Sequence, residues 1–129
     1  MERKIFKAVL WATIEDYARF IDIPLEIYNE IDERYDDKVL EIAKKVLLFY
    51  LQGDYISIFY ENWTLYHSDF VEVSKEKTLE LILNNDSWKD PINDVFITAS
   101  ATKKGEELYY SGKIMDESFK LPKVLEDDN

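Results

Sequence analysis

The chain has 129 residues, of which 27 are Asp or Glu and 16 are Lys or Arg, so its formal charge at pH 7 is −11. This acidity argues against nucleic acids and membrane surfaces as partners, because phosphate backbones and anionic lipids repel a negative protein. The absence of Cys and the presence of a single His exclude thiol catalysis, disulfides and any metal site that needs two His or Cys ligands. This length predicts one globular domain over residues 1–125, and the acidic stretch 126–129 predicts a frayed tail.

The N-terminal part of the sequence predicts helices. Residues 1–12 fit either a strand or a helix, because their apolar positions are compatible with both periods. The hydroxyl of Thr13, followed by acidic residues, is a helix-start signal and predicts a helix over residues 13–22. Pro24 favours the first turn of a helix, so a second helix is expected from there to residue 34.

The third predicted helix has the clearest pattern. Apolar residues recur with helical spacing over residues 39–51, and Gly53 marks the expected end of the helix. From residue 54 onwards, β-branched and aromatic residues become dense, and the polar pair Glu61-Asn62 interrupts the run. These features predict a hairpin over residues 54–67, with a helix as the alternative, because the aromatic spacing also fits a helix.

Two further elements are expected in the C-terminal half. Ser74 is a suitable cap for a helix with three inward-facing residues, Leu79, Ile82 and Leu83. Residues 95–102 and 107–111 flank a Lys-Lys-Gly-Glu turn, which predicts a second hairpin. The expected fold class is therefore α+β, with N-terminal helices packed on an antiparallel sheet formed by C-terminal hairpins. A mostly helical fold with one C-terminal hairpin is the alternative.

The negative charge is concentrated in residues 22–37, which contain seven acidic side chains and one basic side chain. If a helix continues through this segment, the carboxylates gather on one side and the apolar residues on the other. Like charges at helical spacing repel one another, so this face is either a solvated surface or the binding site of a cationic partner. The candidate partner-binding residues are five carboxylates and two aromatic anchors: Glu26, Glu30, Glu33, Asp36, Asp37, Tyr28 and Tyr35.

Two other motifs have simpler explanations. Residues 13–31 have the apolar spacing of a helix-turn-helix, but the helix that would enter a DNA groove carries Glu26 and Glu30, which phosphates repel. The aromatic residues of 54–74 resemble a base-stacking platform, but this segment contains no Lys or Arg, so core packing is expected instead. His67 lies among these aromatic residues and is assigned no role.

No catalytic residue, cofactor or metal ion is predicted. The spacing of the three Gly forms no phosphate-binding loop, and no acid-x-Lys step typical of metal nucleases lies on a predicted strand. The charged N-terminus and the lack of a long apolar run indicate neither a signal peptide nor a membrane span, so a cytoplasmic location is expected.

The sequence therefore predicts a non-enzymatic acidic binding protein that neutralises a basic protein partner. A nuclease toxin fits this description, because it needs a cationic surface to hold phosphates and an immunity protein or antitoxin can cover that surface with carboxylates. Two alternatives remain open at this point. One is a regulatory or DNA-mimic protein derived from a helix-turn-helix domain, and the other is a carboxylate-dependent enzyme.

Overall fold

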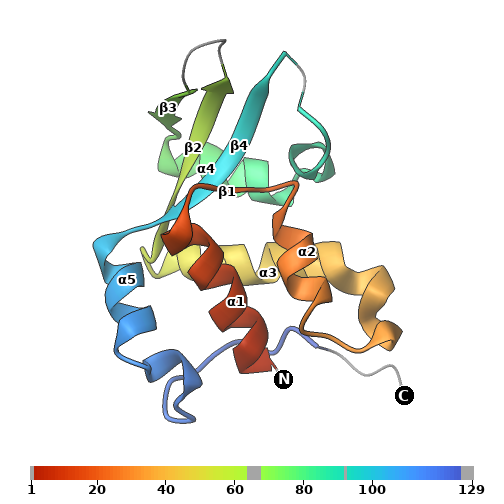
Figure 1. Ribbon diagram of the computed structural model, residues 1–129, viewed down its shortest axis with the longest axis vertical. Helices are drawn as coiled ribbons and strands as arrows, with labels where there is room; N and C mark the ends of the chain where they lie inside the picture. The colour runs from red at the N-terminus through yellow and green to blue at the C-terminus, as the bar shows by residue number, and fades with distance from the viewer. Residues whose placement is uncertain (1, 64–67, 92, 126–129) are drawn as a thin grey trace.

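The computed structural model describes residues 2–63, 68–91 and 93–125, and it has the predicted α+β fold (Figure 1). Within these residues the chain forms five α-helices, three 3-10 helices labelled η, and four strands. In chain order they are α1 (Glu2–Glu15), β1 (Ala18–Arg19), α2 (Ile23–Tyr28), η1 (Glu33–Lys38), α3 (Val39–Gln52), β2 (Ile56–Trp63), β3 (Ser68–Glu72), α4 (Lys75–Leu83), η2 (Asn85–Trp88), β4 (Val95–Ala101), α5 (Lys103–Tyr110) and η3 (Lys113–Met115). The predicted tail at 126–129 lies outside the described residues.

The four strands form one antiparallel sheet in the order β1-β4-β2-β3. The long central strand β2 pairs with β4 on one side and with β3 on the other. A hairpin is therefore present here, but it is displaced from the predicted range 54–67. β2 continues through Glu61 and Asn62, where the sequence predicts a turn, and the second strand β3 follows only at Ser68–Glu72. The connection between the two strands, which includes Tyr66 and His67, lies outside the described residues.

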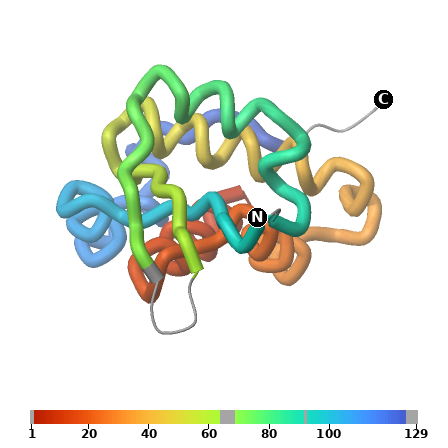
Figure 2. Tube along the Cα trace, turned by 90° about the horizontal axis from the view of Figure 1, so that it is seen from above, coloured from red at the N-terminus to blue at the C-terminus, as the bar shows by residue number. Residues whose placement is uncertain are grey.

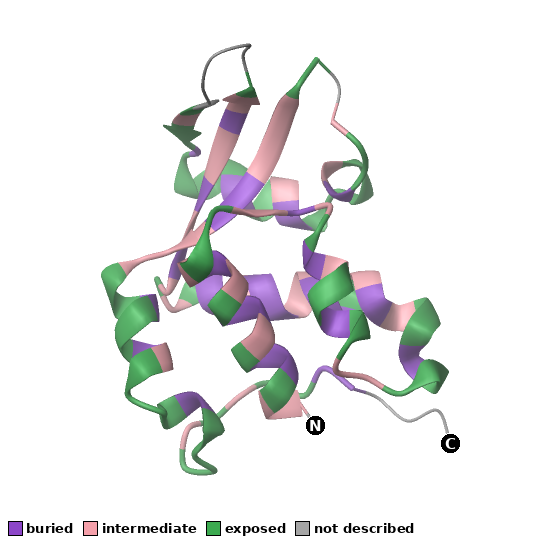
Figure 3. Ribbon diagram, in the orientation of Figure 1, coloured by how far each residue is buried: buried purple, intermediate pink, exposed green. Residues whose placement is uncertain are grey.

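The core lies between the helices and one face of the sheet. Figures 1 and 2 show α3 running below the sheet, between α4 on one side and α1 on the other. Tyr50 joins α3 to α1, because its ring packs against Phe6 and its buried hydroxyl donates a hydrogen bond to the Phe6 carbonyl oxygen. The apolar stripe predicted for α3 is buried at six positions (Figure 3): Val39, Ala43, Val46, Leu47, Tyr50 and Leu51. Leu40, also expected in the stripe, is only half-buried, and Ile42 is buried without having been expected there.

The chain between residues 2 and 22 differs from the prediction. Residues 2–15 form the single helix α1, which resolves the ambiguity of the first twelve residues, and the helix predicted over 13–22 is wrong. Thr13 lies inside α1, where its buried hydroxyl donates to the Leu10 carbonyl oxygen instead of capping a helix start. The chain then forms β1, because the edge of β4 offers hydrogen-bonding groups to Ala18 and Arg19.

The second predicted helix is interrupted. α2 begins near Pro24 as expected, but it ends at Tyr28, and residues 33–38 form the separate helix η1. Asn29 and Asp32 have low helix propensity, and the like charges of Glu26 and Glu30 disfavour a continuing helix. A helix that extends to residue 34 is therefore wrong, and so is a single helical face from 22 to 37.

The buried side of α4 is also displaced from the prediction. The helix begins directly after Ser74, although the Ser74 side chain makes no capping hydrogen bond. Ile82 is buried as expected, whereas Leu79 and Leu83 are exposed. Thr78 is buried one turn before Ile82, so the stripe that faces the core runs through these two positions.

The second predicted hairpin is only half present. β4 forms as expected, but the segment after it is the helix α5 and not a strand. The Thr102 side-chain oxygen caps this helix by accepting a hydrogen bond from the Gly105 N–H. A Cβ atom at residue 105 would lie 2.1 Å from the Tyr55 carbonyl oxygen. Only glycine therefore allows α5 to pack this closely against the start of β2.

Candidate functional site

The predicted partner-binding residues lie on α2, in the turn that follows it and on η1, and they divide into two groups. In the first group, Glu26 projects from α2 and Glu30 lies in the turn that follows it. Both line a hollow of about 490 Å³ together with Lys4, Lys7 and Trp11 of α1. This hollow therefore has carboxylates from the α2 side and ammonium groups from α1.

The second group lies on η1, where Glu33, Asp36 and Asp37 are all exposed. They do not continue the line of carboxylates on α2, because the chain changes direction between the two helices. Tyr28 is exposed, and its hydroxyl lies 3.5 Å from the Asp36 carbonyl oxygen. Tyr35 is buried in the core, so the structure does not present it as an aromatic anchor at the surface.

A second hollow, which was not predicted from the sequence, adjoins the first at Glu26. Its volume is about 390 Å³, and Glu15, Asp16 and Asp22 contribute to its lining. It lies between the end of α1, the short strand β1 and the start of α2. We call the two hollows together the acidic groove, defined by Glu15, Asp16, Asp22, Glu26 and Glu30.

The carboxylates of the acidic groove have no cationic partner among the residues that the structure describes. No Lys or Arg nitrogen in 2–63, 68–91 and 93–125 lies within 4.0 Å of their oxygens. Asp16 accepts a hydrogen bond of 2.7 Å from the Tyr17 N–H. None of these carboxylates therefore forms a close ion pair in this part of the chain, although Lys4, Lys7 and Arg19 line the same two hollows.

A partly buried ion pair lies beside the groove. Arg19 on β1 donates two hydrogen bonds to Glu61 on β2, with Nε–Oε1 at 2.9 Å and Nη2–Oε2 at 3.2 Å. The pKa of Arg19 is raised, mainly by its hydrogen bond to Glu61. Burial lowers this pKa, whereas the negative charges of Asp16 and Asp22 raise it further. Sequence inspection did not single out this pair, because its members are 42 residues apart and meet only when β1 joins the sheet.

The aromatic residues of 54–74, for which core packing was predicted, divide between two faces of the sheet. Tyr55 and Tyr60 pack against the core, as predicted. Trp63 is instead exposed at the end of β2. Phe70 on β3 is half-buried and stacks against Tyr17, with 3.7 Å between the ring centroids. Part of the cluster is therefore a surface and not core.

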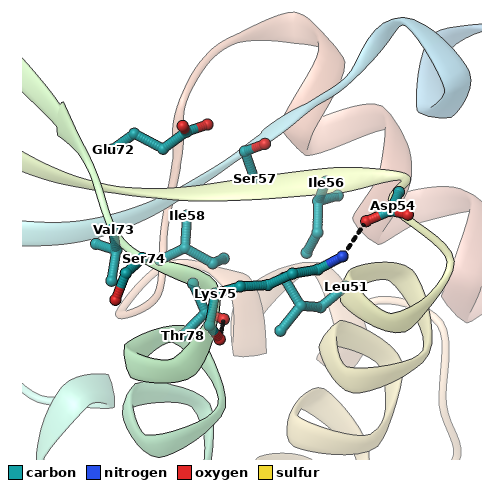
Figure 4. A pocket seen from close by; sticks show the side chains of 10 residues that line it. All are labelled: Leu51, Asp54, Ile56, Ser57, Ile58, Glu72, Val73, Ser74, Lys75 and Thr78. Carbon is teal, nitrogen blue, oxygen red and sulfur yellow. Dashed lines mark hydrogen bonds and ion pairs between the residues drawn. The ribbon is translucent and has the colours of Figure 1, made fainter.

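A third hollow, of about 290 Å³, lies where β3 is followed by α4 (Figure 4). The side chain of Lys75 extends across it, and its Nζ atom lies 2.6 Å from Oδ1 of Asp54. The hydrogen bond from Lys75 is the main cause that lowers the pKa of the Asp54 carboxyl. Both side chains are exposed, so this is a surface ion pair across a polar hollow lined by residues such as Ser57 and Glu72.

Further observations bear on the other classes of function. In the described part of the chain, no group of three or more His, Cys, Asp or Glu side chains is arranged to hold a metal ion. No helix in these residues is long and apolar enough to cross a membrane. The strand β1 separates α1 from α2, so residues 13–31 do not form a helix-turn-helix. Comparisons with protein families, curated proteins and solved structures find no match to this chain.

Proposed function

We propose that this protein is a non-enzymatic acidic binding protein that neutralises a basic protein partner, and that the acidic groove is its main contact. The observation that carries the proposal is the gathering of five carboxylates around two adjoining hollows. They outnumber the three cations of the same lining, Lys4, Lys7 and Arg19, and none of the five forms an ion pair among the described residues. Such a surface attracts a positive partner over about 10 Å at 0.1 M salt, and it increases both the association rate and the specificity.

A nuclease toxin is the partner class that suits this surface best. A nuclease holds phosphates with Lys and Arg, so a carboxylate surface can occupy the same cationic site and exclude the substrate. In this proposal the protein is an immunity protein or antitoxin that acts in the cytoplasm. Glu33, Asp36 and Asp37 on η1 lie apart from the groove, and we assign them a peripheral role in attracting the partner.

The proposal is tested with purified proteins encoded by genes next to that of this chain. We expect one of them to be basic, to form a stoichiometric complex with the full chain, and to lose nuclease activity in that complex. The dissociation constant should rise with salt concentration, because the contact is electrostatic. The absence of a complex with any basic neighbour would count against this function.

Charge reversals locate the contact. The double variant Glu26→Lys/Glu30→Lys should weaken the complex at least about tenfold, since two attractive contacts become repulsive. A matched control, Glu76→Lys/Glu117→Lys, makes the same change in net charge at exposed positions outside the groove and should alter affinity by less than about threefold. Equal losses in both variants would mean that net charge acts alone and that the groove is not the contact.

A further inference from the structure

One face of the sheet carries aromatic residues and an ion pair. Directly paired residues of neighbouring strands point to the same side, so the strand registers place Glu61, Phe70 and Phe96 on one face. Arg19 reaches Glu61 from β1, and Trp63 lies two residues farther along β2, so both belong to this face. Figure 1 shows α4 behind the sheet, on its other side. We call this surface the Arg19 face; it comprises Tyr17, Arg19, Phe59, Glu61, Trp63, Phe70 and Phe96.

The aromatic rings of the Arg19 face are incompletely covered. Trp63 is 55% exposed and Tyr17 is 36% exposed, while Phe59, Phe70 and Phe96 are half-buried. Tyr17 contacts two of these rings, stacking on Phe70 and meeting Phe59 edge to face. Tyr17, Phe59 and Phe70 therefore form one connected ring cluster, while Trp63 and Phe96 both lie beside the Arg19 guanidinium.

The surroundings of this face are negative. The strand residues 56–63, 68–72 and 95–101 contain no Lys or Arg. Arg19 is therefore the one cation on the described strands, and Glu61 already neutralises it. Asp16 and Asp22 act on Arg19 electrostatically from the acidic groove, and Glu72 is exposed at the edge of the sheet. A cationic group that reaches this face therefore meets aromatic rings, with the exposed Glu72 at one side and the acidic groove at the other.

Arg19 itself shows which kind of cation this surface suits. Its guanidinium carbon lies 3.7 Å from the ring centroid of Phe96 and 5.8 Å from that of Trp63, while two of its nitrogens hydrogen-bond to Glu61. A planar guanidinium can stack on a ring and bind a carboxylate at the same time, which an ammonium group does less well. The exposed rings of Trp63 and Tyr17 offer further surface of this type.

We propose that the Arg19 face binds arginine side chains of a basic protein partner, as the apolar part of the interface whose charged part is the acidic groove. This inference rests on the proposed function, from which it takes the positive charge of the partner. It adds a second contact surface and specifies arginine as the side chain that this surface binds. Tyr17 and Arg19 also line the acidic groove, so one partner can cover both surfaces without a break. Exposed Trp and Tyr residues beside charged groups commonly contribute most of the binding energy of an interface.

The test uses the full chain with oligoarginine and oligolysine peptides of equal length as probes. Titration calorimetry measures the affinities, and the NMR signal of the Trp63 indole N–H reports contact with the face. We expect oligoarginine to bind about fivefold more tightly than oligolysine, and Trp63→Ala to weaken oligoarginine about tenfold. Trp63→Phe should restore most of this loss. Tyr110→Ala, which removes an exposed ring from α5, should leave the affinity unchanged.

Each outcome distinguishes this inference from the proposed function. Equal affinities for the two peptides, an unaltered affinity of Trp63→Ala, or no binding of either peptide would overturn arginine recognition at this face. Arginine recognition would also be overturned if Glu26→Lys/Glu30→Lys weakened peptide binding and Trp63→Ala did not. That result would leave the electrostatic basis of the proposed function intact. Arginine binding that depends on Trp63, without any basic protein partner, would support the inference and count against the proposed function.

Discussion

Replacing Arg19 by Met removes the cation that neutralises Glu61, and we expect this change to destabilise the protein strongly. The Glu61 side chain is only 7% exposed, so its carboxylate cannot recover full hydration once the two hydrogen bonds from Arg19 are lost. Breaking a buried ion pair in this way lowers the free energy of unfolding by about 3 kcal/mol.

The reverse change should have a smaller effect. Glu61→Met leaves a guanidinium that is 31% exposed and still stacked on Phe96, so water can replace the carboxylate, and the loss should be about 1 kcal/mol. In the double variant Arg19→Met/Glu61→Met both charges are gone, and the apolar pair should reduce stability by no more than about 1 kcal/mol. The structure thus predicts a coupling energy of about 3 kcal/mol between the two positions.

Urea unfolding of the wild type, both single variants and the double variant measures this coupling. The comparison requires that the unfolding free energy has the same slope against urea concentration in all four proteins. The exposed pair Lys77–Glu80, with 3.3 Å between its charged atoms, is a matched control. Its double-mutant cycle should give a coupling below about 0.5 kcal/mol. If the Arg19 and Glu61 changes are additive, or if Arg19→Met costs no more than Glu61→Met, the Glu61 carboxylate is hydrated and the reasoning fails.

Three further predictions concern packing and titration. Gly105→Ala should lower the free energy of unfolding by about 2 kcal/mol, because the clash of the new Cβ with the Tyr55 carbonyl oxygen outweighs the stabilisation from the higher helix propensity of Ala. A variant that urea unfolding shows to be more stable than the wild type would contradict this packing. Tyr50→Phe should cost about 1 to 2 kcal/mol at neutral pH through the lost hydrogen bond to Phe6. Burial raises the pKa of Tyr50, so the unfolded chain releases the hydroxyl proton at a lower pH than the folded protein does. The stability of the wild type should therefore decline above pH 10.0 more steeply than that of Tyr50→Phe. Equal declines of the two proteins with pH would contradict the assignment. Lys75→Met should raise the pKa of Asp54 towards 3.8 in an NMR titration, and Lys104→Met should raise it less. The lowered pKa of this carboxyl stabilises the wild type at higher pH, and this stabilisation is lost as the pH falls below 3.8, so the Lys75 variant should lose less stability over that range. An unchanged pKa of Asp54 in the variant would show that Lys75 does not bind Asp54 in solution.

The sequence by itself determined the elements whose signal is long and local. The helical repeat of apolar residues identified α3, because one buried side of a helix requires that spacing over several turns. The β-branched and aromatic runs identified β2 and β4 for a similar reason, and together these elements were enough to predict the α+β class. The acidity of the segment around α2 was also evident from composition alone.

Only the tertiary structure decided the elements and contacts that depend on residues far apart in the chain. β1 is two residues long and exists because β4 offers it an edge, and α5 forms where the missing side chain of Gly105 allows a close approach to Tyr55. The candidate site changed for the same reason. The expected row of carboxylates was divided when α2 ended early, whereas Glu15 and Asp16 joined Glu26 in one groove and Arg19 met Glu61 across the sheet. Local periodicity carries no information about such pairings, because their energy comes from hydrogen bonds and burial between segments that fold together.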